Sequence, residues 1–142
     1  SLIHKVKQYY GDDLEGKTFA LWGLAFKPDT DDIREAPALY MIRELLLAKA
    51  KVVAFDPEAM ENVKTVHGDT IEYAENMYSA LKDADALLIA TEWSVFRSPD
   101  FEKVSEGLKK KVIFDGRNLF EPAEMKQLGY HYESIGREKI TS

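Results

Sequence analysis

A chain of 142 residues with 45% hydrophobic and 31% charged side chains has the size and composition of one globular domain, which excludes a disordered chain. Its formal net charge of −6 argues against nucleic acid as a partner, and its longest uncharged run, Thr18 to Phe26, is too short to span a membrane. The absence of cysteine excludes thiol nucleophiles, thiolate metal ligands and disulfides. Since there is also no signal-peptide pattern, we expect a cytoplasmic protein.

The first predicted element is a helix. Leu2, Ile3, Val6, Tyr9 and Tyr10 recur at helical spacing, and the pattern stops at Gly11. Because this pattern is already under way at the first residues, we expect the chain to begin inside the helix rather than before it.

Short apolar runs then alternate with helical patterns. The runs predict buried strands at Thr18–Trp22, Lys51–Phe55, Ala86–Ala90 and Val112–Phe114, a weaker last strand at Tyr130–Tyr132 and an edge strand near Thr70–Glu72. The helical patterns fall at 38–48 with Pro37 at its start, 58–64 behind Asp56-Pro57, 76–81, 101–108 and 122–128.

This alternation predicts an α/β fold, a Rossmann-like, doubly wound and mainly parallel sheet with strand order 3-2-1-4-5-6. Ligands bind such sheets beyond the carboxyl ends of the strands. The loops expected there are Gly23–Glu35, Thr91–Ser98 and Asp115–Glu121.

The first of these loops is long for a strand-to-helix connection, which favours a functional role. It begins with one glycine but lacks the rest of a Gly-x-Gly-x-x-Gly fingerprint, so it does not predict pyrophosphate on the following helix. Lys27 and Arg34 offer cations suited to a phosphate or carboxylate. Alternatively, both cations neutralise the acidic residues of the same loop. We expect no metal site, because the histidines are far apart in sequence.

Four motifs together resemble the UDP-glucose dehydrogenase family over most of residues 17–137. Related GDP-mannose and UDP-N-acetylmannosamine dehydrogenases share much of the first motif, whereas the third and fourth favour the UDP-glucose branch. The motifs are Gly-Leu-Ala-Phe-Lys-Pro-x-Thr-Asp-Asp-x-Arg-Glu at Gly23–Glu35, Asp56-Pro57, Ala90-Thr91-Glu92-Trp93 and Phe114-Asp115-Gly116-Arg117-Asn118.

The resemblance implies a division of the chain and a set of binding residues. Residues 1–16 would be the tail of an inter-domain helix and its junction, and residues 17–142 a UDP-sugar-binding Rossmann-like domain. Phe26, Lys27 and Arg117 would contact the nucleotide sugar, while Arg34 would reach toward NAD.

By the same resemblance, the full enzyme oxidises UDP-glucose to UDP-glucuronate in two NAD-dependent steps through a catalytic cysteine. It would be a homo-oligomer, with NAD held mainly by an N-terminal domain. This chain has no cysteine, so we expect no catalytic residue in it and no activity from it alone. The alternatives are the same domain of a GDP-mannose or UDP-N-acetylmannosamine dehydrogenase, or a free-standing nucleotide-binding module.

Three motif residues also have structural interpretations. Asp56 is best read as a helix N-cap before Pro57 rather than a ribose ligand. Glu92 and Trp93 can brace the edge of the sheet without touching a ligand. Family members often carry serine at the position of Ala36, so the helix that follows is expected to lack a side-chain cap.

Overall fold

Six strands form one sheet in the computed structural model, which describes residues 1–142. The strand order is β3-β2-β1-β4-β5-β6 and every neighbouring pair is parallel, which confirms the predicted fold and order. One antiparallel bridge, Tyr132 to Ile140, lies outside the named strands. The strands are β1 Thr18–Trp22, β2 Lys51–Phe55, β3 Glu72–Tyr73, β4 Ala86–Ile89, β5 Val112–Asp115 and β6 His131–Glu133.

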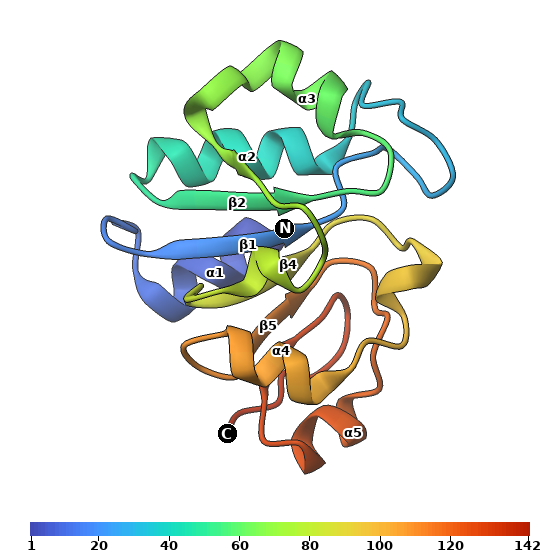
Figure 1. The fold of residues 1–142 in the computed structure, drawn as a ribbon. Helices are drawn as coiled ribbons and strands as arrows, with labels where there is room; N and C mark the ends of the chain where they lie inside the picture. The colour runs from blue at the N-terminus through green and yellow to red at the C-terminus, as the bar shows by residue number, and fades with distance from the viewer.

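Helices connect the strands and cover the sheet (Figure 1). α1 packs beside α2 and also contacts β5, while α4 packs against the short helix η2. α2 and α5 both begin with proline, whose missing N–H has no partner to lose in a first helical turn. The α-helices are α1 Leu2–Tyr10, α2 Pro37–Leu47, α3 Met60–His67, α4 Phe101–Gly107 and α5 Pro122–Gln127, and the 3-10 turns are η1 Gly68–Thr70, η2 Ser79–Leu81 and η3 Ser94–Phe96.

The core explains why the central strands read as unbroken apolar runs. β4 and β5 are buried along their whole length, and β1 is buried from Phe19 to Trp22. Such burial is expected where helices cover both faces of a parallel sheet. Leu2, Ile3 and Val6 of α1 belong to the same buried cluster as these strands.

Two predicted helices differ from the observed ones. The helix expected at 76–81 is only the turn η2, because the backbone leaves helical angles at Lys82, with ψ of 118°, and Asp83 follows with a positive φ. Asn76 caps the start of this turn by accepting from the backbone N–H groups of Tyr78 and Ser79. The helix expected at 58–64 begins at Met60 as α3, with Ala59 at its N-cap. Asp56 caps the turn before it instead of the helix itself.

None of the helices combines the length and the apolar character needed to cross a membrane.

Candidate functional site

Three loops begin side by side at the carboxyl edge of the sheet. Trp22 at the end of β1 pairs with Ile89 at the end of β4, and Ile89 pairs with Asp115 at the end of β5. The loops that follow these strands lie toward the right in Figure 1, where the connection from β1 to α2 projects furthest. The topology therefore brings together the loops predicted to carry the site.

Asp56, directly after β2, holds two of these loops together. Its carboxylate is fully buried and accepts five hydrogen bonds. The donors are the backbone N–H groups of Leu24 (2.7 Å), Ala25 (3.0 Å), Glu58 (2.8 Å) and Ala59 (2.8 Å) and the indole Nε1 of Trp93 (3.2 Å). Its acceptor capacity is thus used within the protein, which supports the structural interpretation of Asp56 over a ribose contact.

Gly23 lets the first loop approach the loop after β4. Its φ of 97° is left-handed, and a Cβ atom there would lie 2.6 Å from both the backbone nitrogen and the Cβ of Thr91. The Thr91 hydroxyl then donates to the carbonyl of Ala25 over 2.8 Å. Only glycine fits this close approach, so the single glycine of the motif serves loop packing.

Arg34 pairs with an acidic residue of its own loop. Its Nε donates to Asp32 Oδ1 over 3.0 Å and its Nη2 donates to Asp32 Oδ2 over 2.8 Å. These bonds from Arg34 lower the pKa of Asp32 to about 2. The Arg34 side chain nevertheless stays 87% exposed, so other donors of its guanidinium remain open to solvent.

The other predicted residues of this loop are also at the surface. Phe26 is 49% exposed and lines one hollow together with Asp32, Arg34 and Glu35. Lys27 is exposed and forms no salt bridge. The alternative that Lys27 and Arg34 only neutralise the acidic residues of their loop is therefore supported for Arg34, which pairs with Asp32, but not for Lys27.

Asp115 shapes the loop after β5. It is fully buried and accepts from the backbone N–H groups of Arg117 (3.0 Å), Leu119 (2.7 Å) and Phe120 (3.2 Å) and from the Tyr132 hydroxyl (2.6 Å). Burial, with the bond to Asp115, raises the pKa of Tyr132, so its hydroxyl remains a donor at neutral pH. The loop is thereby fixed around the backbone of Arg117.

Asn118 completes this loop in a left-handed conformation, with φ of 56°. Its side chain donates to the carbonyl of Ile135 and accepts from the backbone N–H of the same residue, over 2.9 and 2.8 Å. These bonds tie the loop to the segment after β6. Asp29 and Glu35 of the first loop also have positive φ, so strained backbone occurs in both candidate loops.

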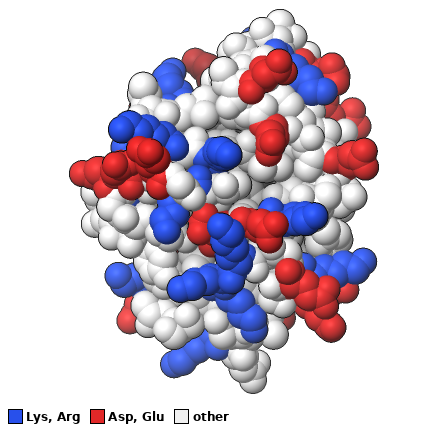
Figure 2. Space-filling model, turned by 60° about the vertical axis from the view of Figure 1, so that its left-hand side comes forward, with Lys and Arg blue, Asp and Glu red and all other residues white.

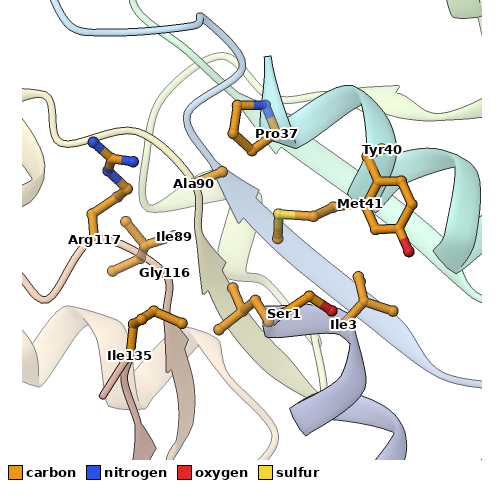
Figure 3. A pocket seen from close by; sticks show the side chains of 11 residues that line it. Ser1, Ile3, Pro37, Tyr40, Met41, Ile89, Ala90, Gly116, Arg117 and Ile135 are labelled. Atoms are coloured by element: carbon orange, nitrogen blue, oxygen red, sulfur yellow. The ribbon is translucent and has the colours of Figure 1, made fainter. Parts of the chain in front are cut away.

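Arg117 lines a cavity of about 210 Å³ beside the ends of β4 and β5. Figure 3 shows Arg117 at one end of this cavity and Tyr40 of α2 at the other. Most of the lining is apolar, so Arg117 supplies its one cationic side chain. The lining residues are Ser1, Leu2, Ile3, Pro37, Tyr40, Met41, Ile89, Ala90, Gly116, Arg117 and Ile135.

Glu92 pairs with Arg117, a contact that the sequence motifs did not reveal. Arg117 Nη2 donates to Glu92 Oε2 over 2.5 Å, and the two residues stand 25 positions apart. Burial alone would raise the pKa of Glu92, but the hydrogen bond and charge of Arg117, together with the backbone of Glu92 and the charge of Arg97, outweigh burial and lower that pKa. Trp93 is buried and its indole Nε1 donates to Asp56, which supports its interpretation as a structural brace.

The predicted site residues thus occupy two places at one edge of the sheet. Phe26 and Arg34 share the hollow of the first loop, Lys27 lies exposed on that loop, and Arg117 lines the separate cavity. No group of three histidine, aspartate or glutamate side chains is arranged to hold a metal ion.

Charged side chains are unevenly distributed over the surface. Figure 2 brings forward the left-hand side of Figure 1, and a group of basic side chains gathers near the middle of that face with acidic side chains around it. Local basic groups therefore coexist with a formal net charge of −6, and this face is not the side of the candidate loops, which lie toward the right in Figure 1.

The doubly wound parallel sheet, with its long loops at the carboxyl edge, defines a Rossmann-like α/β domain. The sequence matches the UDP-glucose/GDP-mannose dehydrogenase family, UDP binding domain, over residues 20–122. The chain belongs to this family.

Similar proteins agree with this assignment. UDP-glucose 6-dehydrogenase from Pseudomonas aeruginosa is 44% identical over 130 residues, which cover 88% of this chain and 29% of that protein. The structure of a UDP-glucose dehydrogenase from Pyrobaculum islandicum matches with a TM-score of 0.80 and 31% identity, over 96% of this chain and 29% of that one. A UDP-D-ManNAc dehydrogenase from Pyrococcus horikoshii matches with a TM-score of 0.72 and 26% identity, over 96% of this chain and 29% of that one. The chain spans less than a third of the length of these relatives.

Proposed function

We propose that this chain is the C-terminal, UDP-sugar-binding domain of an NAD-dependent UDP-glucose 6-dehydrogenase. Residues 1–16 would be the tail of the inter-domain helix and its junction, and residues 17–142 the substrate-binding domain. The proposal rests on family membership and on the names of similar proteins, which include UDP-glucose 6-dehydrogenases from several bacteria.

The observation that carries the proposal is the position of Arg117. Its guanidinium belongs to a mainly apolar cavity at the carboxyl edge of the sheet, where doubly wound folds bind nucleotides. A planar cation beside apolar walls suits a phosphate attached to a less polar nucleoside or sugar.

Phe26 and Lys27 would contact the same nucleotide sugar from the first loop. Their exposure supports this role, because neither side chain is used in the core and Lys27 has no carboxylate partner. A lysine and an arginine on loops of one edge could both reach a doubly charged diphosphate.

Arg34 would reach toward NAD with the guanidinium donors that Asp32 leaves free. The main dinucleotide site would lie in an N-terminal domain, because the start of α2 is unsuited to pyrophosphate. Pro37 has no N–H to donate there, and buried Ala36 precedes it.

NAD would accept the hydride in the full enzyme, while this domain's residues bind and orient the substrate. Holding the UDP portion far from the reacting carbon uses remote binding energy to position the sugar. We further propose that the full protein is a cytoplasmic homo-oligomer in which the N-terminal domain completes the substrate pocket.

Calorimetric or NMR titration of the chain with UDP tests the proposal. We expect weak, salt-sensitive binding with a Kd of about 1 mM, because other parts of the pocket are provided elsewhere. Lys27→Ala and Arg117→Ala should each weaken binding by roughly 10- to 100-fold if each cation makes a charge-assisted bond to phosphate. Lys64→Ala, an exposed cation on α3, is the matched control and should bind UDP like the native chain.

Two further measurements separate the assigned roles. Arg34→Ala should leave UDP affinity nearly unchanged, since its proposed partner is the cofactor. Competition between UDP and GDP distinguishes the UDP-glucose branch of the family from the GDP-mannose branch. Preferential binding of GDP would assign the chain to the GDP-mannose branch. Unchanged UDP affinity in a folded Lys27→Ala, Arg117→Ala double variant would refute the proposed binding residues.

A further inference from the structure

The Arg117 side chain is held by a carboxylate that has few other partners. Glu92 Oε2 accepts from Arg117 Nη2 over 2.5 Å, and Arg117 is the only side chain that hydrogen-bonds to Glu92. The other carboxylate oxygen, Oε1, is buried and accepts no hydrogen bond. Without Arg117, this carboxylate would have no side-chain hydrogen-bond donor.

The pair leaves most of the guanidinium open. Only Nη2 of Arg117 is engaged, while Nε and Nη1 make no hydrogen bond within the protein, and the side chain is 39% exposed. Glu92 is more enclosed, with 24% of its side chain exposed. An anion can therefore bind Arg117 without displacing Glu92.

We propose that Glu92 is a positioning residue that orients the Arg117 guanidinium toward the phosphate of a nucleotide sugar. This inference rests on the proposed function of the site. Asp115 fixes the backbone of Arg117 from one side, and Glu92 fixes the end of its side chain from the next loop. The guanidinium is thereby preorganised, and less side-chain entropy is lost on binding.

The opposite effect of Glu92 is electrostatic repulsion of the ligand, since a carboxylate beside a phosphate site opposes anion binding. Two substitutions separate these effects. Glu92→Gln removes the charge but keeps an oxygen that can accept from Arg117 Nη2, whereas Glu92→Ala removes both. If Glu92 acts by orienting the Arg117 guanidinium, only the alanine variant should bind UDP more weakly.

The experiment is a UDP titration of the native chain, the two Glu92 variants, Arg117→Ala and the Glu92→Ala, Arg117→Ala double variant. We expect Glu92→Ala to weaken binding about tenfold, and Glu92→Gln to stay within about threefold of the native Kd. In the Arg117→Ala background, Glu92→Ala should change the Kd by less than about twofold, because its effect passes through Arg117. Thermal melts establish that each variant is folded at the titration temperature.

A second readout follows Arg117 directly. The NMR signals of its guanidinium N–H groups should be resolved in the native chain and in Glu92→Gln, and averaged by rotation in Glu92→Ala. Native-like or tighter UDP binding by Glu92→Ala would overturn the inference, as would equal weakening in the Arg117→Ala background. Equal weakening by glutamine and alanine would also overturn it. If the native chain still binds UDP, each of these results overturns the role of Glu92 but leaves the proposed function standing. If the native chain does not bind UDP, both the role of Glu92 and the proposed function are overturned.

Discussion

The contact between Arg34 and Asp32 shows how a single residue pair can shape an exposed loop. Both bonds of the guanidinium fork go to one carboxylate two positions earlier, and the backbone N–H of Arg34 also donates to Asp32 Oδ1 over 2.9 Å. The carbonyl of Asp32 in turn accepts from the backbone N–H of Phe26 over 2.7 Å. Asp32 therefore links the cation proposed for the cofactor to the aromatic residue proposed for the substrate.

This pair predicts an unusual acid titration. The pKa of Asp32 is lowered to about 2 by the hydrogen bonds and charge of Arg34, so the contribution of the pair to stability is present above the ordinary value near 4. That contribution is lost as the pH falls through about 2. A carboxyl ¹³C titration should place the midpoint of Asp32 near 2, and Arg34→Ala should move it upward toward about 4.

Arg43→Ala is the control for this titration, because Arg43 stacks on Tyr40 and makes no salt bridge with Asp32. It should leave the Asp32 midpoint in place. An ordinary midpoint near 4 in the native chain would show that the pair does not persist in solution.

Asp56 marks the limit of what neighbouring residues reveal about a side chain. Its bonds to the N–H groups of Glu58 and Ala59 follow from local sequence, because aspartate before proline commonly caps a turn or helix. Its bonds to Leu24, Ala25 and Trp93 join residues more than 30 positions away, and these depend on the tertiary fold. The N-cap interpretation therefore predicted the hydrogen bonds that Oδ1 of Asp56 accepts, but not those that Oδ2 accepts.

At the scale of elements, strands were predicted better than short helices. Each central strand is a continuous apolar run, and burial on both faces makes that pattern hard to mistake. The segment 76–81 begins as a helix does, with Asn76 accepting from the N–H groups of Tyr78 and Ser79, but its backbone leaves helical angles at Lys82. Apolar spacing indicates where such a segment lies, but it does not record where the backbone leaves the helical conformation.

The uncapped start of α2 gives a prediction about one element. Ala36 has extended backbone angles suited to an N-cap residue but makes no side-chain bond, as expected from the sequence. Ala36→Ser should stabilise the chain by about 0.5 to 1 kcal/mol, because the hydroxyl can accept from a free N–H of the first turn. Urea unfolding followed by circular dichroism measures the change.

The control for this substitution is Ala123→Ser at an exposed position inside α5. The same chemical change there should have no stabilising effect, since serine is a poorer helix former than alanine. A loss of stability in Ala36→Ser would indicate that the buried position does not tolerate the hydroxyl.

At the scale of the whole molecule, topology predicted that the candidate loops share one edge of the sheet, but it did not predict the contacts between them. Strand order alone places the loops after β1, β4 and β5 at one edge, and the register confirms it. The pairing of Glu92 with Arg117 and the cavity lined by α1 and α2 arise from packing between distant segments. No residue spacing in the sequence encodes those distances.

The packing of α1 leads to a prediction for the entire fold. Ile3 and Val6 are 3% and 0% exposed and belong to the same core cluster as the central strands, although α1 precedes the first strand. An Ile3→Ala, Val6→Ala double variant should lose about 4 to 6 kcal/mol, because each truncation removes buried methyl groups and leaves a cavity. That loss approaches the whole stability of a typical domain, about 5 to 15 kcal/mol, so the variant should unfold at much lower urea concentration.

His4→Ala changes the exposed side of the same helix and should unfold like the native chain. Equal unfolding midpoints for the double variant and the native chain would mean that α1 does not pack on the sheet in solution.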